Sequence, residues 1–174
     1  MDRVRATAAA LSALILAGCS GPQPDCTSSG DWRLFHGTWE DARWSCDVLE
    51  MQQQAALRAF TSGRVKDRRF SDAAKLTAGT HVYQQDAYEW DLLGMQVRGS
   101  TDVPFHAVFI CAGDPGRTSL VHEMAHVIQG GIPTVLVGAP ELEAWGPSHG
   151  GWVADGIFAA IDEADDEIQR RMKP

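Results

Sequence analysis

Two histidines and a glutamate stand at a spacing that can bind a metal ion and use it for hydrolysis. His122 and His126 are four positions apart, with Glu123 directly after the first of them. Residues four apart on an α-helix lie on the same face, so both imidazoles can bind one Zn²⁺. The Glu123 carboxylate can then take the proton of a zinc-activated water. The spacing predicts Zn²⁺ as the cofactor, His122 and His126 as metal ligands and Glu123 as the general base.

A catalytic zinc has a third protein ligand and keeps its fourth position open. Three downstream residues are candidates for this ligand, namely Glu141, Glu143 and His149. The loop of residues 130–140, rich in glycine and proline, gives the chain room to turn back towards the helix. His149 has a second candidate role, as a catalytic hydrogen-bond donor to the oxyanion formed when a carbonyl is attacked. It also fits a plain glycine-rich turn that faces solvent, so ligand type alone leaves the third ligand open.

The segment around these residues resembles a known superfamily. Residues 119–129, Ser-Leu-Val-His-Glu-Met-Ala-His-Val-Ile-Gln, are similar to the active-site helix of zincin metallopeptidases, and of small bacterial gluzincins in particular. The resemblance implies a short sheet whose edge strand, in the region of residues 95–110, binds an extended peptide. Gluzincins take their third ligand from a Glu-x-x-Ala frame, which implies Glu141. Related families often place an aspartate four residues further on, and this chain departs from them with Trp145.

The metal-binding residues need a helix with defined ends. Residues 114–116, Asp-Pro-Gly, are typical of a helix start, with the aspartate at the cap and the proline in the first turn. Gly130 and Gly131 follow Gln129, and Pro133 comes soon after. These residues commonly end a helix. We therefore expect a helix from about residue 114 to Gln129.

Hydrophobic periodicity indicates the other elements. Residues 39–60 carry apolar side chains at helical spacing and predict a long first helix. Residues 81–83, 94–98 and 105–110 resemble short strands separated by turns. An amphipathic pattern over residues 153–172 predicts a last helix. The predicted fold class is α+β and zincin-like, with an N-terminal helix, a small mainly antiparallel sheet, the zinc-binding helix and C-terminal helices.

The N-terminus has the features of an export signal. Two arginines among the first five residues precede an apolar run over residues 6–17. A membrane-spanning helix needs about 20 apolar residues, so this run fits a signal peptide instead. It ends in Leu-Ala-Gly-Cys at residues 16–19, which resembles a bacterial lipobox. That resemblance implies cleavage before Cys19 and acylation of its thiol; the alternative is an ordinary signal peptide with a chance cysteine.

These features divide the chain into three parts. We expect residues 1–18 to be a lipoprotein signal peptide, residues 19–31 the lipidated cysteine and a linker, and residues 32–174 a zincin-like metallopeptidase domain. The expected location is the bacterial cell envelope, at the outer membrane if the host is diderm. The lipid anchor would be the sole contact with the membrane.

Export would place the remaining cysteines in an oxidising compartment. With Cys19 acylated, Cys26, Cys46 and Cys111 allow one disulfide and one remaining thiol. We favour Cys46–Cys111, because Cys26 lies in the expected linker. Spacing by itself does not fix the pair.

Composition narrows the partners. The 174 residues are 44% hydrophobic and 22% charged, near the averages of globular proteins, so a packed core is expected. The formal net charge of −8 argues against nucleic acid as a partner. A monomer acting on a protein or peptide substrate is the favoured interpretation. The alternatives are a non-catalytic zinc-containing lipoprotein that serves as a binding or scaffold module, and hydrolysis of a peptidoglycan peptide or amide.

Overall fold

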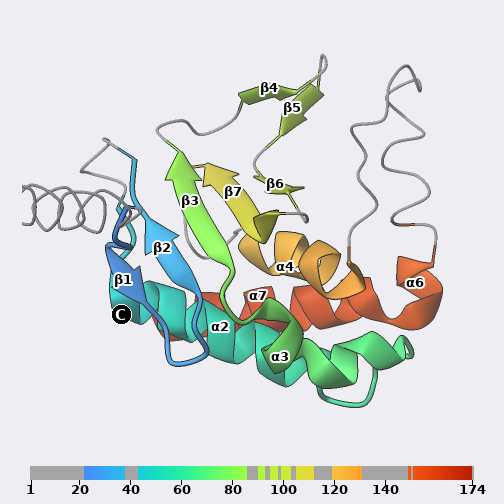
Figure 1. The fold of residues 1–174 in the computed structure, drawn as a ribbon. Helices are drawn as coiled ribbons and strands as arrows, with labels where there is room; N and C mark the ends of the chain where they lie inside the picture. Colours follow the sequence, from blue (N-terminus) through green and yellow to red (C-terminus); the bar gives the residue numbers. More distant parts are fainter. Residues whose placement is uncertain are drawn as a thin grey trace, which may run out of the picture.

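The computed structural model shows a mixed α+β fold in which helices cover one face of a small sheet (Figure 1). It describes residues 22–37, 43–85, 90–92, 95–97, 99–102, 105–111, 119–130, 149 and 151–173. The strands are β1 (Cys26–Thr27), β2 (Arg33–Phe35), β3 (His81–Gln85), β4 (Trp90–Leu92), β5 (Met95–Val97), β6 (Gly99–Asp102) and β7 (Ala107–Cys111). The helices are α2 (Cys46–Phe60), the 3₁₀ helix η2 (Arg68–Asp72), α3 (Ala73–Thr77), α4 (Leu120–Gln129), α6 (Trp152–Asp155) and α7 (Ile157–Met172).

The main sheet has the strand order β1-β2-β3-β7-β6. The two outer pairs, β1–β2 and β6–β7, are antiparallel, whereas β2–β3 and β3–β7 are parallel. The expectation of a mainly antiparallel sheet is therefore wrong at its centre. A parallel pair needs a crossover connection, and α2, η2 and α3 supply it between β2 and β3. The alternation of apolar residues predicts strands but carries no information on their relative direction. Strands β4 and β5 form a separate antiparallel pair.

Helix α2 begins later than its hydrophobic pattern suggests. The pattern predicts a start near residue 39, but residues 43–45 are not helical and α2 starts at Cys46. Ser45 is the N-cap, and its side chain accepts a hydrogen bond from the Val48 amide at 3.3 Å. A side chain that satisfies a first-turn amide fixes where a helix starts, and periodicity alone does not reveal it.

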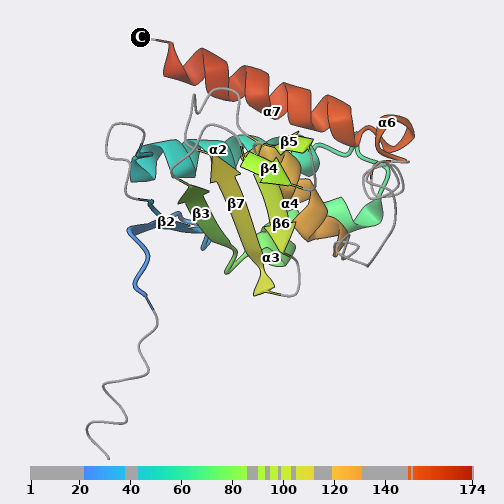
Figure 2. The ribbon, with the colours of Figure 1, turned by 90° about the horizontal axis from the view of Figure 1, so that it is seen from above.

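The expected last helix is divided at Gly156. This residue has a φ of 76°, ends α6 at Asp155 and precedes α7. A Cβ at this position would lie 3.0 Å from the Arg64 carbonyl oxygen, so a larger residue would be both strained and crowded. The break allows α6 to turn away from α7, which runs along α2 (Figure 2).

The core lies between the sheet and the helix layer. Trp32 and Leu34 from the sheet side are fully buried, as are Leu120 and Met124 of α4. Strand β1 pairs with β2, so the folded domain includes Cys26 and Thr27, which we expected in the linker of residues 19–31. The expected signal peptide and Cys19 lie outside the described residues. Among the described helices, none is long and apolar enough to cross a membrane.

Candidate metal centre

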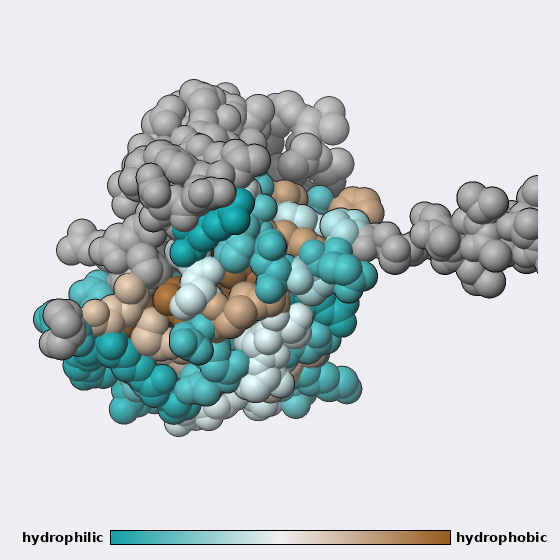
Figure 3. Space-filling view, turned by 90° about the vertical axis from the view of Figure 1, so that its left-hand side faces the viewer, coloured by the Kyte–Doolittle hydropathy of each residue, from teal (hydrophilic) through white to brown (hydrophobic). Residues whose placement is uncertain are grey.

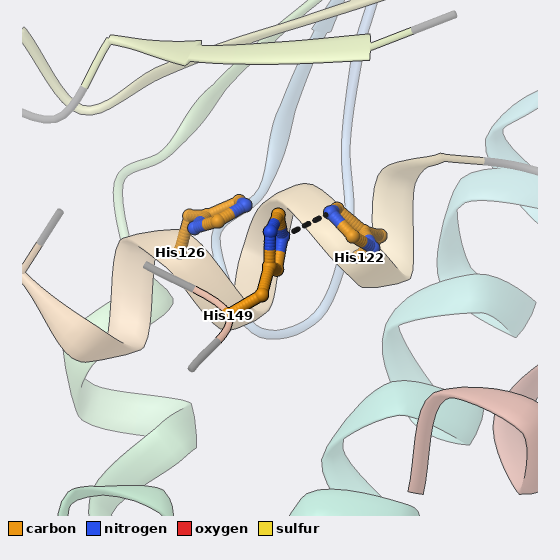
Figure 4. Close-up of side chains that lie close together, drawn as sticks. All are labelled: His122, His126 and His149. Atoms are coloured by element: carbon orange, nitrogen blue, oxygen red, sulfur yellow. Dashed lines mark hydrogen bonds between the residues drawn. The ribbon is translucent and has the colours of Figure 1, made fainter. Parts of the chain in front are cut away.

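Three histidines from two segments meet beside the sheet. His122 and His126 lie on α4, and His149 approaches them from just before α6 (Figure 4). One ring nitrogen of each can be chosen such that all three lie within 4.8 Å of one another. The Nε2 atoms of His149 and His122 are 3.1 Å apart. The group could bind one metal ion.

Helix α4 presents its two histidines because its other face is apolar. Leu120, Met124, Val127 and Ile128 are buried in the core, whereas both histidine side chains are only partly buried. The helix ends at Gln129, as predicted, and the amide of the next residue donates to carbonyls of the last turn. It begins at Leu120, and the Asp-Pro-Gly start expected at residues 114–116 lies outside the described residues.

Trp152 forms the wall of the site. Its ring centroid lies 5.0 Å from that of His122, 4.8 Å from that of His126 and 4.4 Å from that of His149. The indole is 1% exposed, and its Nε1 donates to Oε1 of Gln129 at 2.8 Å. A buried, hydrogen-bonded ring in contact with all three imidazoles holds them in place and excludes water from that side.

Burial keeps two of the imidazoles neutral. It lowers the pKa of His122 to about 4, with a further contribution from His149. Burial also lowers the pKa of His126 to about 3, with contributions from His122 and His149. Neutral imidazole is the form that binds a metal, so these residues are prepared for binding at neutral pH.

Glu123 is buried against the edge strand of the sheet. It is 3% exposed, and the Thr101 hydroxyl on β6 donates to its Oε2 at 2.6 Å. Burial raises the pKa of Glu123 to about 7, and the hydrogen bond from Thr101 opposes the rise. A Cβ at Gly99 would lie 2.8 Å from Glu123 Oε1 and 2.6 Å from Ser119 Oγ, so only glycine fits there. A carboxyl group with a pKa near neutrality can both accept and return a proton.

The structure sorts the sequence-predicted residues into two groups. It brings His122, His126 and His149 together and places Glu123 on the same helix. Glu141 and Glu143 lie outside the described residues, so their roles as ligands stay predictions. The same holds for the oxyanion-donor role of His149, which no contact of the structure tests.

Two residues of the site, Thr101 and Trp152, were not predicted from the sequence. Thr101 lies in a polar Gly-Ser-Thr-Asp strand, and its partner Glu123 is 22 positions away. Trp152 follows His149 by three positions, a nearness that could have marked it as a neighbour of the metal centre. Tryptophans are mostly core residues, and this one is both core and site.

Comparison of the chain with family models, curated proteins and solved structures finds no match. The chemistry of the site therefore rests on the residues of this chain, and the likeness to zincins is a resemblance of one helix.

Proposed function

We propose that this protein is a zinc-dependent metallopeptidase of the bacterial cell envelope, anchored through lipid on Cys19. The observation that supports it best is that one ring nitrogen from each of three histidines lies within 4.8 Å of the others, and two of these histidines are on a helix that also carries a buried glutamate. A histidine pair alone is a weak motif. A third histidine that comes from a distant segment is stronger support for a metal site than the pair alone, because it would seldom meet the pair by chance.

The proposed donor set suits zinc. Three imidazole nitrogens, from His122, His126 and His149, match the three-ligand sets of catalytic zinc sites, which leave one position open. When bound, zinc lowers the pKa of water and polarises the carbonyl under attack. Imidazole also binds copper, nickel and iron, so the identity of the metal is part of the proposal.

Glu123 is the proposed general base. Its carboxylate would take the proton of the attacking water and return it to the leaving amine, which requires a pKa near neutrality in the free enzyme. Burial supplies that pKa of about 7. The Thr101 hydroxyl fixes one carboxylate oxygen, which restricts the orientation of the base.

The sheet offers a place for an extended peptide. Among the described strands β6 is at the edge of the main sheet, with β7 as its neighbour, and it lies within the region expected to bind substrate. Thr101 Oγ1 also lies 3.2 Å from the main-chain carbonyl oxygen of Glu123, so β6 runs beside α4. A peptide that pairs with the edge of a sheet is bound through main-chain hydrogen bonds.

The decisive experiment measures metal content and hydrolysis together. Purified protein should contain about one zinc per chain and cleave an unstructured protein substrate, and Glu123→Gln should retain zinc but lose at least about 100-fold in kcat. Glu163→Gln, which alters an exposed carboxylate paired with Arg64, is the matched control and should keep both properties. Zinc without Glu123-dependent hydrolysis would favour the scaffold alternative, and protein with no zinc would refute the site.

A further inference from the structure

Two cysteines lie on neighbouring elements at the side of the molecule away from α6. Cys26 begins β1 and Cys46 begins α2, and β1 packs against α2. Figure 1 shows β1 on the other side of the molecule from α6. Burial and, after it, the Cys46 thiol raise the pKa of Cys26. Cys46 is exposed and Cys26 is partly buried, and neither is in a disulfide in this structure, so the expected Cys46–Cys111 disulfide is not formed.

His36 fixes the backbone on one side of the two cysteines. Its amide donates to Asp25 Oδ2 at 2.7 Å, one residue before Cys26. Its Nε2 is 2.7 Å from the carbonyl oxygen of Trp44, two residues before Cys46. One residue thus joins the backbone before Cys26 to the backbone before Cys46, through its amide and its ring.

A second set of hydrogen bonds fixes the other side. The Ser29 amide donates to Glu50 Oε2 at 2.6 Å, and the Gly30 amide donates to Gln53 Oε1 at 2.8 Å. These bonds join the turn after β1 to successive turns of α2. These hydrogen bonds fix the backbone beside both cysteines, so the nearness of β1 to the start of α2 follows from the fold. Figure 3, which views this side of the molecule, shows hydrophobic residues among hydrophilic ones near the surface.

We propose that Cys26 and Cys46 form a disulfide that fastens strand β1 to the start of α2. Formation of this bond requires the two cysteines to approach closely without moving the backbone, and the hydrogen bonds on both sides hold β1 and the start of α2 next to each other. The bond would close a loop of 20 positions. It would also fix the folded domain at the point where the expected lipid tether enters it.

The oxidant is a disulfide, carried by an oxidoreductase of an oxidising compartment or by oxidised glutathione. The exposed Cys46 thiolate attacks one sulfur of the oxidant and expels one of its thiols, which leaves a mixed disulfide at Cys46. The Cys26 sulfur then attacks Cys46 Sγ and expels the second thiol of the oxidant. The protein loses two protons and two electrons in total, and the oxidant takes them up and becomes two thiols. Burial and the neighbouring Cys46 raise the pKa of Cys26 to about 12. Cys46 is the exposed thiol of the two, so it meets the oxidant first.

Peptide mapping of the full chain tests the pair directly. The protein is oxidised with glutathione disulfide, the remaining thiols are alkylated, and the chain is cleaved before aspartates. This cleavage separates all four cysteines, which fall in residues 2–24, 25–30, 41–46 and 102–113. We expect peptide 25–30 linked to peptide 41–46. Alkylation of both peptides after oxidation, or a link between either peptide and any other, would overturn the proposal.

A stability measurement provides a second test. Reduction of the oxidised protein should lower its melting temperature by about 5–10 °C, the shift expected when a disulfide closing a loop of this length is opened in a chain of this size. Cys46→Ser should melt at the same temperature with or without reductant. Cys111→Ala, the matched control, should keep the response to reductant. An oxidised wild type whose melting is insensitive to reductant would contradict the proposal.

Discussion

Thr101 on β6 donates a 2.6 Å hydrogen bond to the buried carboxylate of Glu123 on α4. The single proton of this hydroxyl is shared with the Glu123 main-chain carbonyl oxygen, which lies 3.2 Å from Thr101 Oγ1. One side chain of the edge strand therefore holds both the backbone and the side chain of the proposed base. The relationship connects the strand where an extended peptide would bind to the group that would activate the nucleophile.

Replacement of Thr101 by valine should reduce catalysis without removing the metal. Valine keeps the shape of the side chain and removes the hydrogen bond, so the Glu123 carboxylate loses its fixed orientation. A misplacement of about 1 Å can cost about 100-fold in rate, and we expect a loss in kcat of between about 10-fold and 100-fold. Zinc content should not change, because Thr101 is not one of the proposed zinc ligands. Thr101→Ser restores the hydroxyl and should recover most of the rate; wild-type kcat in the valine variant would refute this role.

Asp165 on α7 should make the protein less stable as pH rises. Burial, together with Asp162 and Asp166, raises its pKa to about 7 from a model-compound value of 3.8. Its Oδ1 is buried and has no hydrogen-bond partner among the described residues. Because the folded pKa is the higher one, the folded state binds more protons between these values. The contribution of Asp165 is therefore most favourable below about pH 4 and is lost as pH rises through 7.

Asp165→Asn should remove the loss of stability that the ionisation of Asp165 causes as pH rises. Allowing for partial solvent exposure, we expect a gain of about 1–2 kcal/mol in the free energy of unfolding at about pH 8 and little gain near pH 4. Urea unfolding at the two pH values measures it. Asp162→Asn, which removes one neighbouring charge, should give a smaller gain. An asparagine variant with the wild-type pH profile would show that Asp165 ionises normally.

The sequence predicts the elements of this fold better than their arrangement. The apolar face of α4 and the glycine after Gln129 allow this helix and its end to be predicted from the sequence alone. The start of α2 is not predicted by the pattern of apolar residues, because the N-cap Ser45 determines it. The parallel centre of the sheet depends on how helices cross between strands, and the strand pattern does not contain that information.

Local spacing likewise predicts only part of the site. His122, Glu123 and His126 are within one helical turn and a half, where geometry follows from sequence. His149 reaches them across a segment of 22 residues, so ligand type could nominate it but could not select it. Thr101 and Trp152 become part of the site through packing between elements, which a single sequence does not reveal.

Trp152 should affect metal binding as well as stability. Trp152→Phe keeps an apolar wall but loses the hydrogen bond to Gln129, and we expect a loss in zinc affinity of about 10-fold, as for other residues that orient metal ligands. Trp32→Phe is a matched control, because Trp32 is also fully buried and donates to Thr77 Oγ1 at 3.0 Å. Both variants should be destabilised, but Trp32→Phe should bind zinc normally. Equal losses of zinc affinity would indicate a general effect of destabilisation.

Cys19→Ser should release the protein from the membrane. The lipobox-like sequence implies acylation of this thiol, and serine cannot form the thioether that carries the lipid. Palmitate labelling and fractionation of cells expressing each form measure the outcome. Cys46→Ser should label and fractionate like the wild type. A labelled Cys19→Ser protein would refute the assigned lipidation site.

His149 should be worth more to zinc binding than Glu141 or Glu143. Loss of a residue that only orients a ligand costs about 10-fold to 100-fold in affinity, so His149→Ala, which removes a proposed ligand, should cost at least about 100-fold. Glu141→Gln and Glu143→Gln should bind within a few-fold of wild type. His106→Asn is a matched control, because asparagine tolerates the positive φ of 49° at that position. Chelator competition measures all four variants.

The result also decides between the two functions considered for the chain. If His149→Ala and Glu141→Gln each cost at least about 100-fold, the metal has four protein ligands, and a closed tetrahedral site is structural. The scaffold interpretation would then hold, and Glu123→Gln would have no hydrolysis to abolish. If only His149→Ala has this effect, three histidines leave one position open, and the helix of two of them also carries Glu123, whose pKa burial raises to about 7. That arrangement has the components that hydrolysis requires.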